Sequence, residues 1–370
     1  MKAFKPAGID KAMLAAVLVL LGVGFIMVFS SSAVMSGQKY NQPMHFLIQQ
    51  ITGALAGLAL IFFFVSVRRW LFESPAVIYG LLALTVALLT ACFMMPTVAR
   101  VNRWVILFGV RFQPSELAKL SLVLFFAWYL DRKQARIHEP RSLVLPVAVM
   151  GLFALLILKE PDYGTALLIC AIGGMMLYLG GARLLHLGIL GAGAAVLFGI
   201  YLFSASYRVE RITGFVSTQK DIMGRDFQAY QAKLAVGSGG LLGVSLGEST
   251  QKLDFLPYAH TDFIYAILGE EFGLVGTLTI LLLFLVILWR GLTISSRAPT
   301  TSARLSALGL TLVITAQALL NITVVLGLGP AKGVPLPFVS FGRSSLVCSL
   351  AAVGLILSIS KRRRIERYGR

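Results

Sequence analysis

The sequence is dominated by apolar runs of about 20 residues, which recur along nearly its whole length. A helix of about 20 residues covers the roughly 30 Å of hydrocarbon in a bilayer. Of the 370 residues, 57% are hydrophobic and 13% are charged, and the mean hydropathy is +0.83, far outside the range of soluble domains. A β-barrel would instead need alternating segments of about ten residues, which do not occur. The sequence therefore predicts an all-α polytopic integral membrane protein.

Apolar runs bounded by charges and turn residues predict ten spans. Their approximate limits are 12–33, 44–66, 76–95, 114–130, 142–158, 164–180, 184–203, 262–289, 303–326 and 343–360. An even number of spans places both termini on one side. More than half of the Lys and Arg residues fall on that side, and most of the others lie in two long segments, 96–119 and 204–261, which the positive-inside rule weights little. Both termini are predicted to be cytoplasmic.

The formal net charge of +17 would suggest nucleic acid as a partner in a soluble protein. The spans favour a membrane protein instead, and no nucleic-acid, zinc or P-loop motif accompanies the charge; Gly237-Ser-Gly-Gly lacks the Lys-Ser/Thr of a P-loop. Cys92, Cys170 and Cys348 fall in apolar runs without metal-like spacing and are interpreted as core residues.

The longest predicted loop, 204–261, lies between spans seven and eight on the external side. Long structured loops tend to carry function. This one contains an amphipathic helical pattern at 227–237, which is typical of a helix in the membrane interface, followed by a glycine-rich turn. Its basic and acidic residues balance, so an anion site there must depend on local placement.

The end of this loop runs into span eight and carries four titratable residues: His260, Asp262, Glu270 and Glu271. Asp262 stands at a helix N-terminus near water, where a carboxylate is tolerated and can act as a cap. Glu270 and Glu271 lie deeper in the span. They are expected to face polar partners inside the bundle and to have a supporting role.

Three further external features are candidate sites. Arg103 and Trp104 precede Glu116 and Lys119, which lie three residues apart and can pair on one helix face. These residues are either a structural ion pair with an interfacial tryptophan, or an anion site in which Arg103 and Lys119 meet a head group and Glu116 positions the lysine.

Asp162, in the turn before a span, is either an ordinary N-cap or a supporting site residue. Residues 321–345 contain prolines and glycines that break the helix at membrane depth, where irregular backbone must be buried in protein or line a cavity. In this segment Lys332, Arg343 and the hydroxyls of Ser340 and Ser344 would suit a diphosphate.

Five motifs in order resemble the SEDS (FtsW/RodA/SpoVE) family of cell-wall polymerases. They are Arg111-Phe-Gln-Pro-Ser-Glu, Pro161-Asp-Tyr-Gly-Thr, Tyr230-Gln-Ala-Lys-Leu-Ala-Val-Gly-Ser-Gly-Gly-Leu-Leu-Gly, Phe255-Leu-Pro-Tyr-Ala-His-Thr-Asp-Phe and Gly333-Val-Pro-Leu-Pro-Phe. The resemblance covers essentially the whole chain, so residues 1–370 are expected to form a single membrane domain with the loop 204–261 as a sub-region. The amino-acid sequence of that loop resembles FtsW, the division branch, more than RodA.

The resemblance implies a peptidoglycan glycosyltransferase of the bacterial cytoplasmic (inner) membrane. Such an enzyme polymerises lipid II at the outer face of that membrane, with a class B penicillin-binding protein as its transpeptidase partner and with other division proteins at the septum. The family's essential loop aspartate falls on Asp262, and its other functional positions fall on Arg103, Trp104, Glu116 and Lys119. Two departures are Ser340-Phe-Gly-Arg343 in place of Ser-Tyr-Gly-Gly and Val101-Asn102 before Arg103 in place of Ala-Arg.

The expected reaction joins the sugar 4-hydroxyl of one lipid-linked disaccharide to the anomeric carbon of another and expels a lipid diphosphate with inversion. Asp262 is assigned as the base, with His260 as its rival because a helix N-terminus lowers the basicity of a carboxylate. Arg103, Lys119 and Lys332 are assigned to the diphosphate. No organic cofactor is expected, and a divalent cation (Mg or Mn) is a candidate Lewis acid.

Other functions remain open from the sequence. Ten spans, intramembrane acids and broken helices also suit a lipid II flippase, although no inverted repeat is visible. A scaffold for division proteins is a third alternative, with the basic tail from Lys361 as a docking site or, more simply, as a positive-inside anchor. The sequence does not separate a septal role from elongation or sporulation.

Overall fold

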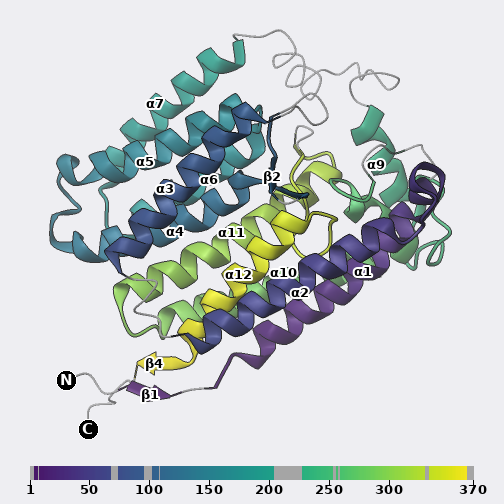
Figure 1. Cartoon of the computed structure of the whole chain (residues 1–370), viewed down its shortest axis with the longest axis horizontal. Coiled ribbons are helices and arrows are strands. Elements are labelled where there is room, and N and C mark those ends of the chain that lie inside the picture. Colours follow the sequence, from purple (N-terminus) through teal and green to yellow (C-terminus); the bar gives the residue numbers. More distant parts are fainter. Residues whose placement is uncertain are drawn as a thin grey trace.

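The computed structural model describes residues 4–6, 8–67, 74–95, 102–107, 109–203, 227–252, 256, 259–329 and 333–364, and these form a bundle of long helices (Figure 1). Its α-helices are α1 (Lys11–Tyr40), α2 (His45–Ser66), α3 (Pro75–Ala91), α4 (Pro114–Arg132), α5 (Pro140–Lys159), α6 (Tyr163–Leu179), α7 (Leu184–Phe203), α9 (Phe227–Ser238), α10 (Ile264–Ser296), α11 (Thr301–Val325) and α12 (Arg343–Ser360). Short 3-10 turns, Cys92–Met94 and Gln134–Arg136, follow α3 and α4.

Several helices begin at a residue whose side chain satisfies the first backbone donors. The Asp10 carboxylate accepts a bond from Met13 N at 3.0 Å, and the Thr300 hydroxyl accepts one from Ala303 N at 3.1 Å. Proline occupies the first position of α3, α4 and α5, where its missing N–H has no cost.

Helices α1 to α7 and α10 to α12 occupy the ten ranges predicted as spans. Among the described residues, seven helices are long and apolar enough to cross a membrane: α1, α2, α3 with its 3-10 turn, α5, α10, α11 and α12. Charges at both ends of α4 and the 17-residue length of α6 keep these two outside that group. Helix α7 also falls outside it and is counted, over Leu184–Val196, with the shorter apolar helices. The multi-pass, helical character is confirmed, whereas the number of ten crossings stays a prediction.

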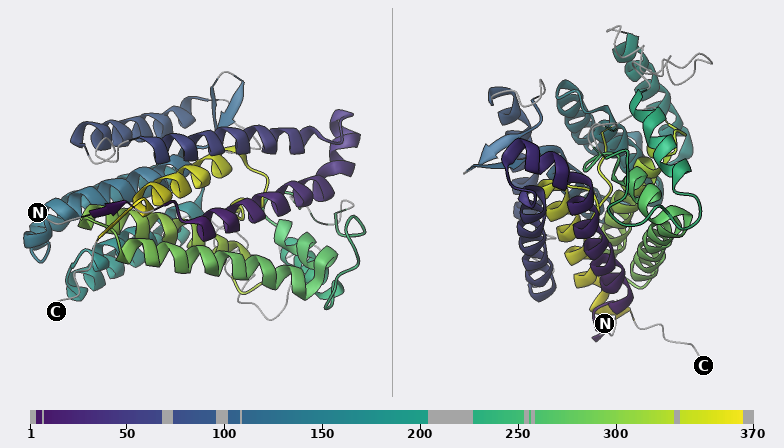
Figure 2. Two further views of the ribbon diagram at one scale, coloured as in Figure 1. Left: turned by 90° about the horizontal axis from the view of Figure 1, so that it is seen from below. Right: turned by 90° about the vertical axis from the view of Figure 1, so that its right-hand side faces the viewer.

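The centre of the bundle is formed by α4, α11 and α12, whose buried residues lie on all sides. Helix α2 packs along α12, α10 packs between α1 and α11, and α3 and α6 cover α4 (Figure 1). Helices α1 and α10 run antiparallel along much of their length (Figure 2). The periphery includes α7, whose described apolar side chains are mostly exposed.

Two small antiparallel pairs of strands accompany the helices and were not predicted. β2 (Val105–Leu107) and β3 (Val110–Phe112) form a hairpin just before α4. β1 (Phe4–Pro6) pairs with β4 (Arg362–Arg364), so the first and last described segments meet at one end of the bundle (Figure 1). This agrees with two termini on one side of the membrane; their cytoplasmic placement stays a prediction.

The predicted break after span nine is confirmed, because α11 ends at Val325 and residues 333–342 contain no helix before α12 begins. This segment is buried in protein, as irregular backbone at membrane depth must be. A Cβ added to Gly24 of α1 would collide with the Phe338 carbonyl, so a glycine is required where the segment crosses α1.

Candidate active site around Asp262

Asp262 lies in a turn, 259–263, that immediately precedes α10. The N-cap of α10 is Phe263, and no side chain caps this helix, so Asp262 does not serve as the cap that its position suggested. Its backbone is held by Asn321 of α11, whose amide donates to the carbonyls of Asp262 and Val334, each at 2.8 Å. Asn321 thereby ties the turn to the broken segment.

The Asp262 carboxylate is partly buried and faces the backbone of Gly333, since a Cβ built there would lie 2.9 Å from its Oδ2. No described side chain forms a hydrogen bond or ion pair with it. Burial raises the pKa of Asp262 to about 7; the positive charge of Arg103 opposes this effect and the negative charge of Asp162 adds to it. At neutral pH this carboxyl group can both accept and release a proton.

Arg103 is positioned by the turn between α5 and α6. Its Nε donates to the Glu160 carbonyl at 2.9 Å and its Nη2 donates to the Pro161 carbonyl. The guanidinium is partly buried and close enough to Asp262 to lower the pKa of that carboxyl group. Trp104 follows it directly and is also partly buried. The structure thus brings Arg103 to the Asp262 side of the bundle, although the two side chains do not form an ion pair.

Two acids share the turn that holds Arg103. Asp162 is the N-cap of α6: it accepts bonds from Thr165 N at 3.1 Å and from the Thr165 hydroxyl at 2.9 Å. It also accepts from Gln113 Nε2 at 3.3 Å. Asp162 is therefore the N-cap predicted from the sequence, and its negative charge lies near Asp262.

Glu160 is fully buried, and neither of its carboxylate oxygens has a hydrogen-bond partner among the described residues. Burial raises the pKa of Glu160 to about 8, and the charge of Asp162 acts in the same direction, while the Cys92 thiol and Arg103 oppose them. A buried, unpaired carboxylate is costly, so this group is held largely protonated at neutral pH. Glu160 was not among the site residues predicted from the sequence.

Glu116 and Lys119 form an ion pair one turn into α4, with Lys119 Nζ 2.8 Å from Glu116 Oε2 and both side chains buried. Lys119 also donates to Gln317 Oε1 of α11. Gln317 in turn donates to the Pro335 carbonyl at 3.0 Å. The ion pair is therefore linked through Gln317 to the broken segment. Glu116 and Lys119 thus form the structural ion pair that the sequence allowed. A contact of Lys119 with substrate stays a proposal.

The hydroxyls of the two serines assigned to substrate binding form hydrogen bonds with backbone groups in this structure. The Ser340 hydroxyl accepts from Leu336 N at 2.8 Å. The Ser344 hydroxyl accepts from Gln113 N at 3.1 Å and donates to the Arg111 carbonyl at 3.3 Å, which joins α12 to the strand before α4. Lys332, the third cation assigned to the diphosphate, lies outside the described residues.

His260 is partly buried with its ring against Phe46 and Phe341, at centroid distances of 4.8 and 5.9 Å. Its carbonyl accepts a bond from Phe341 N at 3.0 Å. Burial lowers the pKa of His260 to about 4, so the ring is neutral near pH 7 and is a weak proton acceptor.

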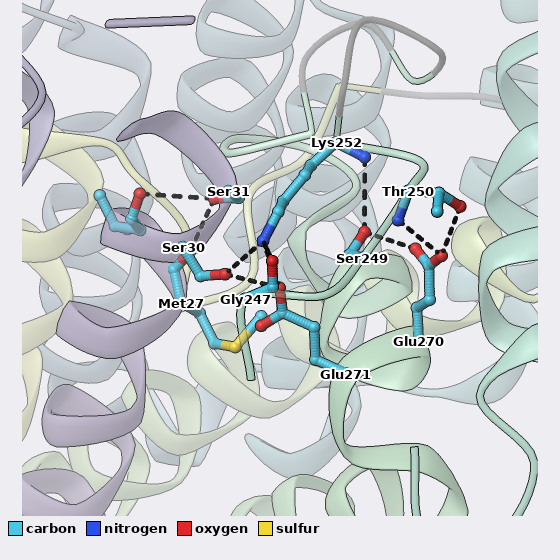
Figure 3. Close-up of polar contacts among 10 residues, drawn as sticks. Met27, Ser30, Ser31, Gly247, Ser249, Thr250, Lys252, Glu270 and Glu271 are labelled. Atoms are coloured by element: carbon cyan, nitrogen blue, oxygen red, sulfur yellow. Dashed lines mark hydrogen bonds and ion pairs between the residues drawn. The ribbon is translucent and has the colours of Figure 1, made fainter. Parts of the chain in front are cut away.

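Glu270 and Glu271 occur further along α10 and both have partners (Figure 3). Glu270 accepts from the Ser249 hydroxyl at 2.5 Å and from Thr250 N at 3.0 Å. Glu271, on another face of the helix, accepts from Lys252 Nζ at 2.9 Å and from the Ser30 hydroxyl of α1 at 2.5 Å. Both carboxylates are buried and bind the loop after α9 to the helix bundle.

Three amide side chains in apolar helices were missed by the sequence analysis as site residues. Asn321 and Gln317 of α11 hold the turn and the broken segment, as described above. Gln50 of α2 donates to the Ser340 carbonyl at 3.0 Å and accepts from Gly342 N at 3.3 Å. A neutral amide inside an otherwise apolar span is the signal that could have found them, since such groups need polar partners there.

No group of three or more His, Cys, Asp or Glu side chains among the described residues is arranged to hold a metal. A divalent cation that assists the leaving diphosphate stays a prediction. The two acids near Asp262 have other surroundings: Asp162 caps α6, and Glu160 is buried in protein.

The chain is similar to known proteins along nearly its whole length. The family model described as cell cycle protein, FtsW/RodA/SpoVE, matches residues 11–365. The chain belongs to the FtsW/RodA/SpoVE family. One relative is the "probable peptidoglycan glycosyltransferase FtsW" of Trichlorobacter lovleyi, 38% identical over 97% of this chain and 95% of the relative. Another is the stage V sporulation protein E of Bacillus subtilis, 38% identical over 95% of this chain and 96% of the relative.

Solved structures of the FtsW/RodA/SpoVE family share the fold. A chain from a study of a peptidoglycan synthase complex that coordinates polymerization and crosslinking superposes with a TM-score of 0.78 at 25% identity, covering 98% of this chain and 99% of that one. The rod shape determining protein RodA of Thermus thermophilus gives a TM-score of 0.69 at 26% identity and covers 98% of each chain.

One of the departures from the family pattern has a structural consequence. Phe341, where the family commonly has tyrosine, packs its ring against His260 and Phe46. Arg343, where glycine is common, is the first residue of α12 and lies against Gly53 of α2.

Proposed function

We propose that this chain is a peptidoglycan glycosyltransferase that polymerises lipid II into glycan strands, with Asp262 as the general base. The observation that carries the proposal is the Asp262 carboxylate, which is partly buried, unpaired among the described side chains and has a pKa of about 7. A general base works best when its pKa lies near the operating pH. The names of the FtsW/RodA/SpoVE relatives support the same reaction class.

Asp262 is held by Asn321 near the C-terminal end of α11, whereas Arg290 of α10 pairs with Asp10 at the end where the termini meet. If the termini are cytoplasmic, as the charge distribution predicts, Asp262 faces the outer side of the membrane. This is the side on which a lipid-linked disaccharide would be joined to a growing strand. The described part of the long loop that contacts α10, residues 239–252, and residues 333–342 of the broken segment also lie away from the end where the termini meet.

In the proposed reaction Asp262 accepts the proton of the sugar 4-hydroxyl as its oxygen attacks the anomeric carbon of the second lipid-linked sugar. The bond from that carbon to the lipid diphosphate breaks with inversion, and the diphosphate leaves with the electron pair. Arg103, Lys119 and Lys332 are proposed to stabilise this negative charge, and Trp104, Glu116, His260, Ser340 and Ser344 to shape the binding site. The proton then passes from Asp262 to water.

Asp262 is preferred over His260 as the base. Burial lowers the pKa of His260 to about 4, whereas burial raises the pKa of Asp262 to about 7. A carboxylate that caps a helix loses basicity, but the Asp262 side chain does not cap α10. We assign His260 to positioning, through its contacts with Phe341 and Phe46.

We further propose a septal role, in which the chain works with a class B penicillin-binding protein and other division proteins. The FtsW names of several relatives support this, as does the match to a chain of a peptidoglycan synthase complex. The similar B. subtilis sporulation protein keeps the sporulation alternative open.

The test is polymerisation of lipid II by the purified, reconstituted chain, with and without its cognate class B penicillin-binding protein. Asp262→Asn should make no glycan strand, while His260→Gln should retain polymerisation. Polymerisation by Asp262→Asn together with an inactive His260→Gln would reverse the assignment of the base. Vesicles that scramble labelled lipid II without forming glycan would instead show that the chain is a transporter.

A further inference from the structure

The loop after α9 lies along the flank of α10. Val244 N donates to the Glu270 carbonyl at 3.0 Å, and Leu274 N donates to the Gly240 carbonyl at 3.0 Å. The Tyr265 hydroxyl donates to the Thr277 carbonyl at 3.2 Å, so α10 bends back sharply at Gly273, and Glu270 and Glu271 lie beside this bend and not deeper in the span as the sequence predicted. The loop forms its hydrogen bonds at this bend. These bonds replace helical ones, because α10 is interrupted at Gly273, where φ is 63°.

Glycines make this close contact between backbones possible. A Cβ on Gly239 would collide with the Gly269 carbonyl, and one on Gly243 would collide with the Glu271 carbonyl. The loop and the interrupted helix thus satisfy each other's backbone groups without help from water. Irregular backbone needs such internal partners wherever it borders the hydrocarbon of a membrane.

The side chains of the loop have the reverse of the usual polarity of a water-facing loop. Ser249 is buried, and the side chain of Lys252 is 7% exposed and points inward to Glu271 (Figure 3). By contrast, Leu241 and Leu242 are 70% and 80% exposed, with Val244 and Leu246 also exposed. Exposed apolar residues of α10 continue this surface: Phe272, Leu274, Val275 and Leu278.

Two polar clusters indicate the depth of this surface in the bilayer. At one end of the antiparallel helices α1 and α10, Arg290 pairs with Asp10; at the other, Ser30 and Glu271 meet Lys252. Between the clusters each helix runs for about 20 residues, or about 30 Å, which is the thickness of the hydrocarbon core. No Asp, Glu, Lys or Arg occurs in residues 12–29 or 272–289.

We infer that residues 239–247 form a wedge in the outer leaflet of the membrane, with Leu241, Leu242, Val244 and Leu246 in contact with lipid acyl chains. Lys252 and Glu271 mark the outer boundary of the hydrocarbon, and the wedge lies at that level. Its occupant is bilayer lipid, because its apolar surface continues that of a membrane-crossing helix. The inference does not depend on the proposed reaction.

The test places nitroxide labels on single cysteines in the full-length chain reconstituted in liposomes, with Cys92, Cys170 and Cys348 replaced by alanine. Leu242→Cys is compared with Leu278→Cys, on the exposed side of α10, and with Gln42→Cys. Gln42 is exposed in the connection after α1 and lies beyond Ser30 on the same end of the bundle. Collision rates are measured with molecular oxygen, which is enriched in lipid, and with a water-soluble nickel chelate.

The wedge predicts that position 242 favours oxygen over the nickel chelate as strongly as position 278 does, at least five-fold more than position 42. A ratio like that of position 42 would overturn it by placing the loop in water. A label shielded from both reagents would overturn it by showing that another protein segment covers the loop. If the cysteine-free chain fails to fold, Leu242→Trp, Leu278→Trp and Gln42→Trp in the native chain give the same comparison through quenching by brominated lipids.

Discussion

Two groups of acids around the first part of α10 differ in whether their carboxylates have partners. Glu270 and Glu271 accept hydrogen bonds from Ser249, Thr250 and Ser30, and Glu271 also pairs with Lys252. Asp262 and Glu160 have no such partners among the described residues, and burial raises the pKa of each to near neutrality. The carboxylates with donors hold the loop to the helix bundle, whereas the unpaired ones remain able to exchange protons near pH 7.

The largest expected effect is the loss of polymerisation activity when the unpaired carboxylate of Asp262 is removed. Asp262→Asn should lower the rate of lipid II polymerisation by about 10²–10⁴-fold, as loss of a general base does. Its melting temperature should be unchanged or higher, because no described contact of the carboxylate is lost. A variant that is both inactive and strongly destabilised would contradict the proposed role and show that Asp262 is structural.

Breaking the paired group should instead affect stability. Lys252→Met leaves the Glu271 carboxylate buried without its cation, which costs about 3–5 kcal/mol. Thermal unfolding in detergent measures this loss. As the matched control, Lys252→Met combined with Glu271→Gln removes the uncompensated charge and should recover most of it. A double variant as unstable as the single one would show that the ion pair is not the cause.

The pH dependence of the reaction sharpens the assignment of the base. Asp262 must be ionised to accept a proton, and burial raises its pKa to about 7. The rate at saturating lipid II should therefore rise about tenfold per pH unit below about pH 6 and level off above about pH 8. His260→Gln should keep this profile. A rate that is already constant from pH 5 upward would favour His260, whose pKa burial lowers to about 4.

The smallest effect concerns Glu160. Its pKa is raised to about 8 in the folded chain, so between its ordinary pKa of 4.5 and pH 8 the folded state holds a proton that the unfolded state has lost. Stability should fall as the pH rises through this window. Glu160→Gln removes this loss, so its melting temperature should exceed that of the wild type by a few degrees at pH 8 and by less at pH 5.

The control for this measurement is Glu139→Gln, at an exposed position before α5. Its melting temperature should follow that of the wild type at both pH values. An equal gain for Glu160→Gln at pH 5 and pH 8 would show that improved packing, and not the removal of a buried charge, stabilises that variant.

The sequence by itself determined the class of fold and the positions of the helices. Apolar runs of the length of a bilayer can only be helices in a chain without strand alternation, so all ten ranges were found as helices. Local signals also located the break after α11 and the capping role of Asp162, because prolines, glycines and an acid before a helix act over a few residues.

Only the tertiary structure decided which polar groups meet. Asn321 lies 59 residues from Asp262, and Ser30 lies 241 residues from Glu271, so no local pattern could connect them. The same holds for Glu160, whose isolation follows from the helices that enclose it. Proton affinity depends on burial and on charges brought close by folding, and this is why the sequence could name Asp262 and His260 as rival bases but could not choose between them.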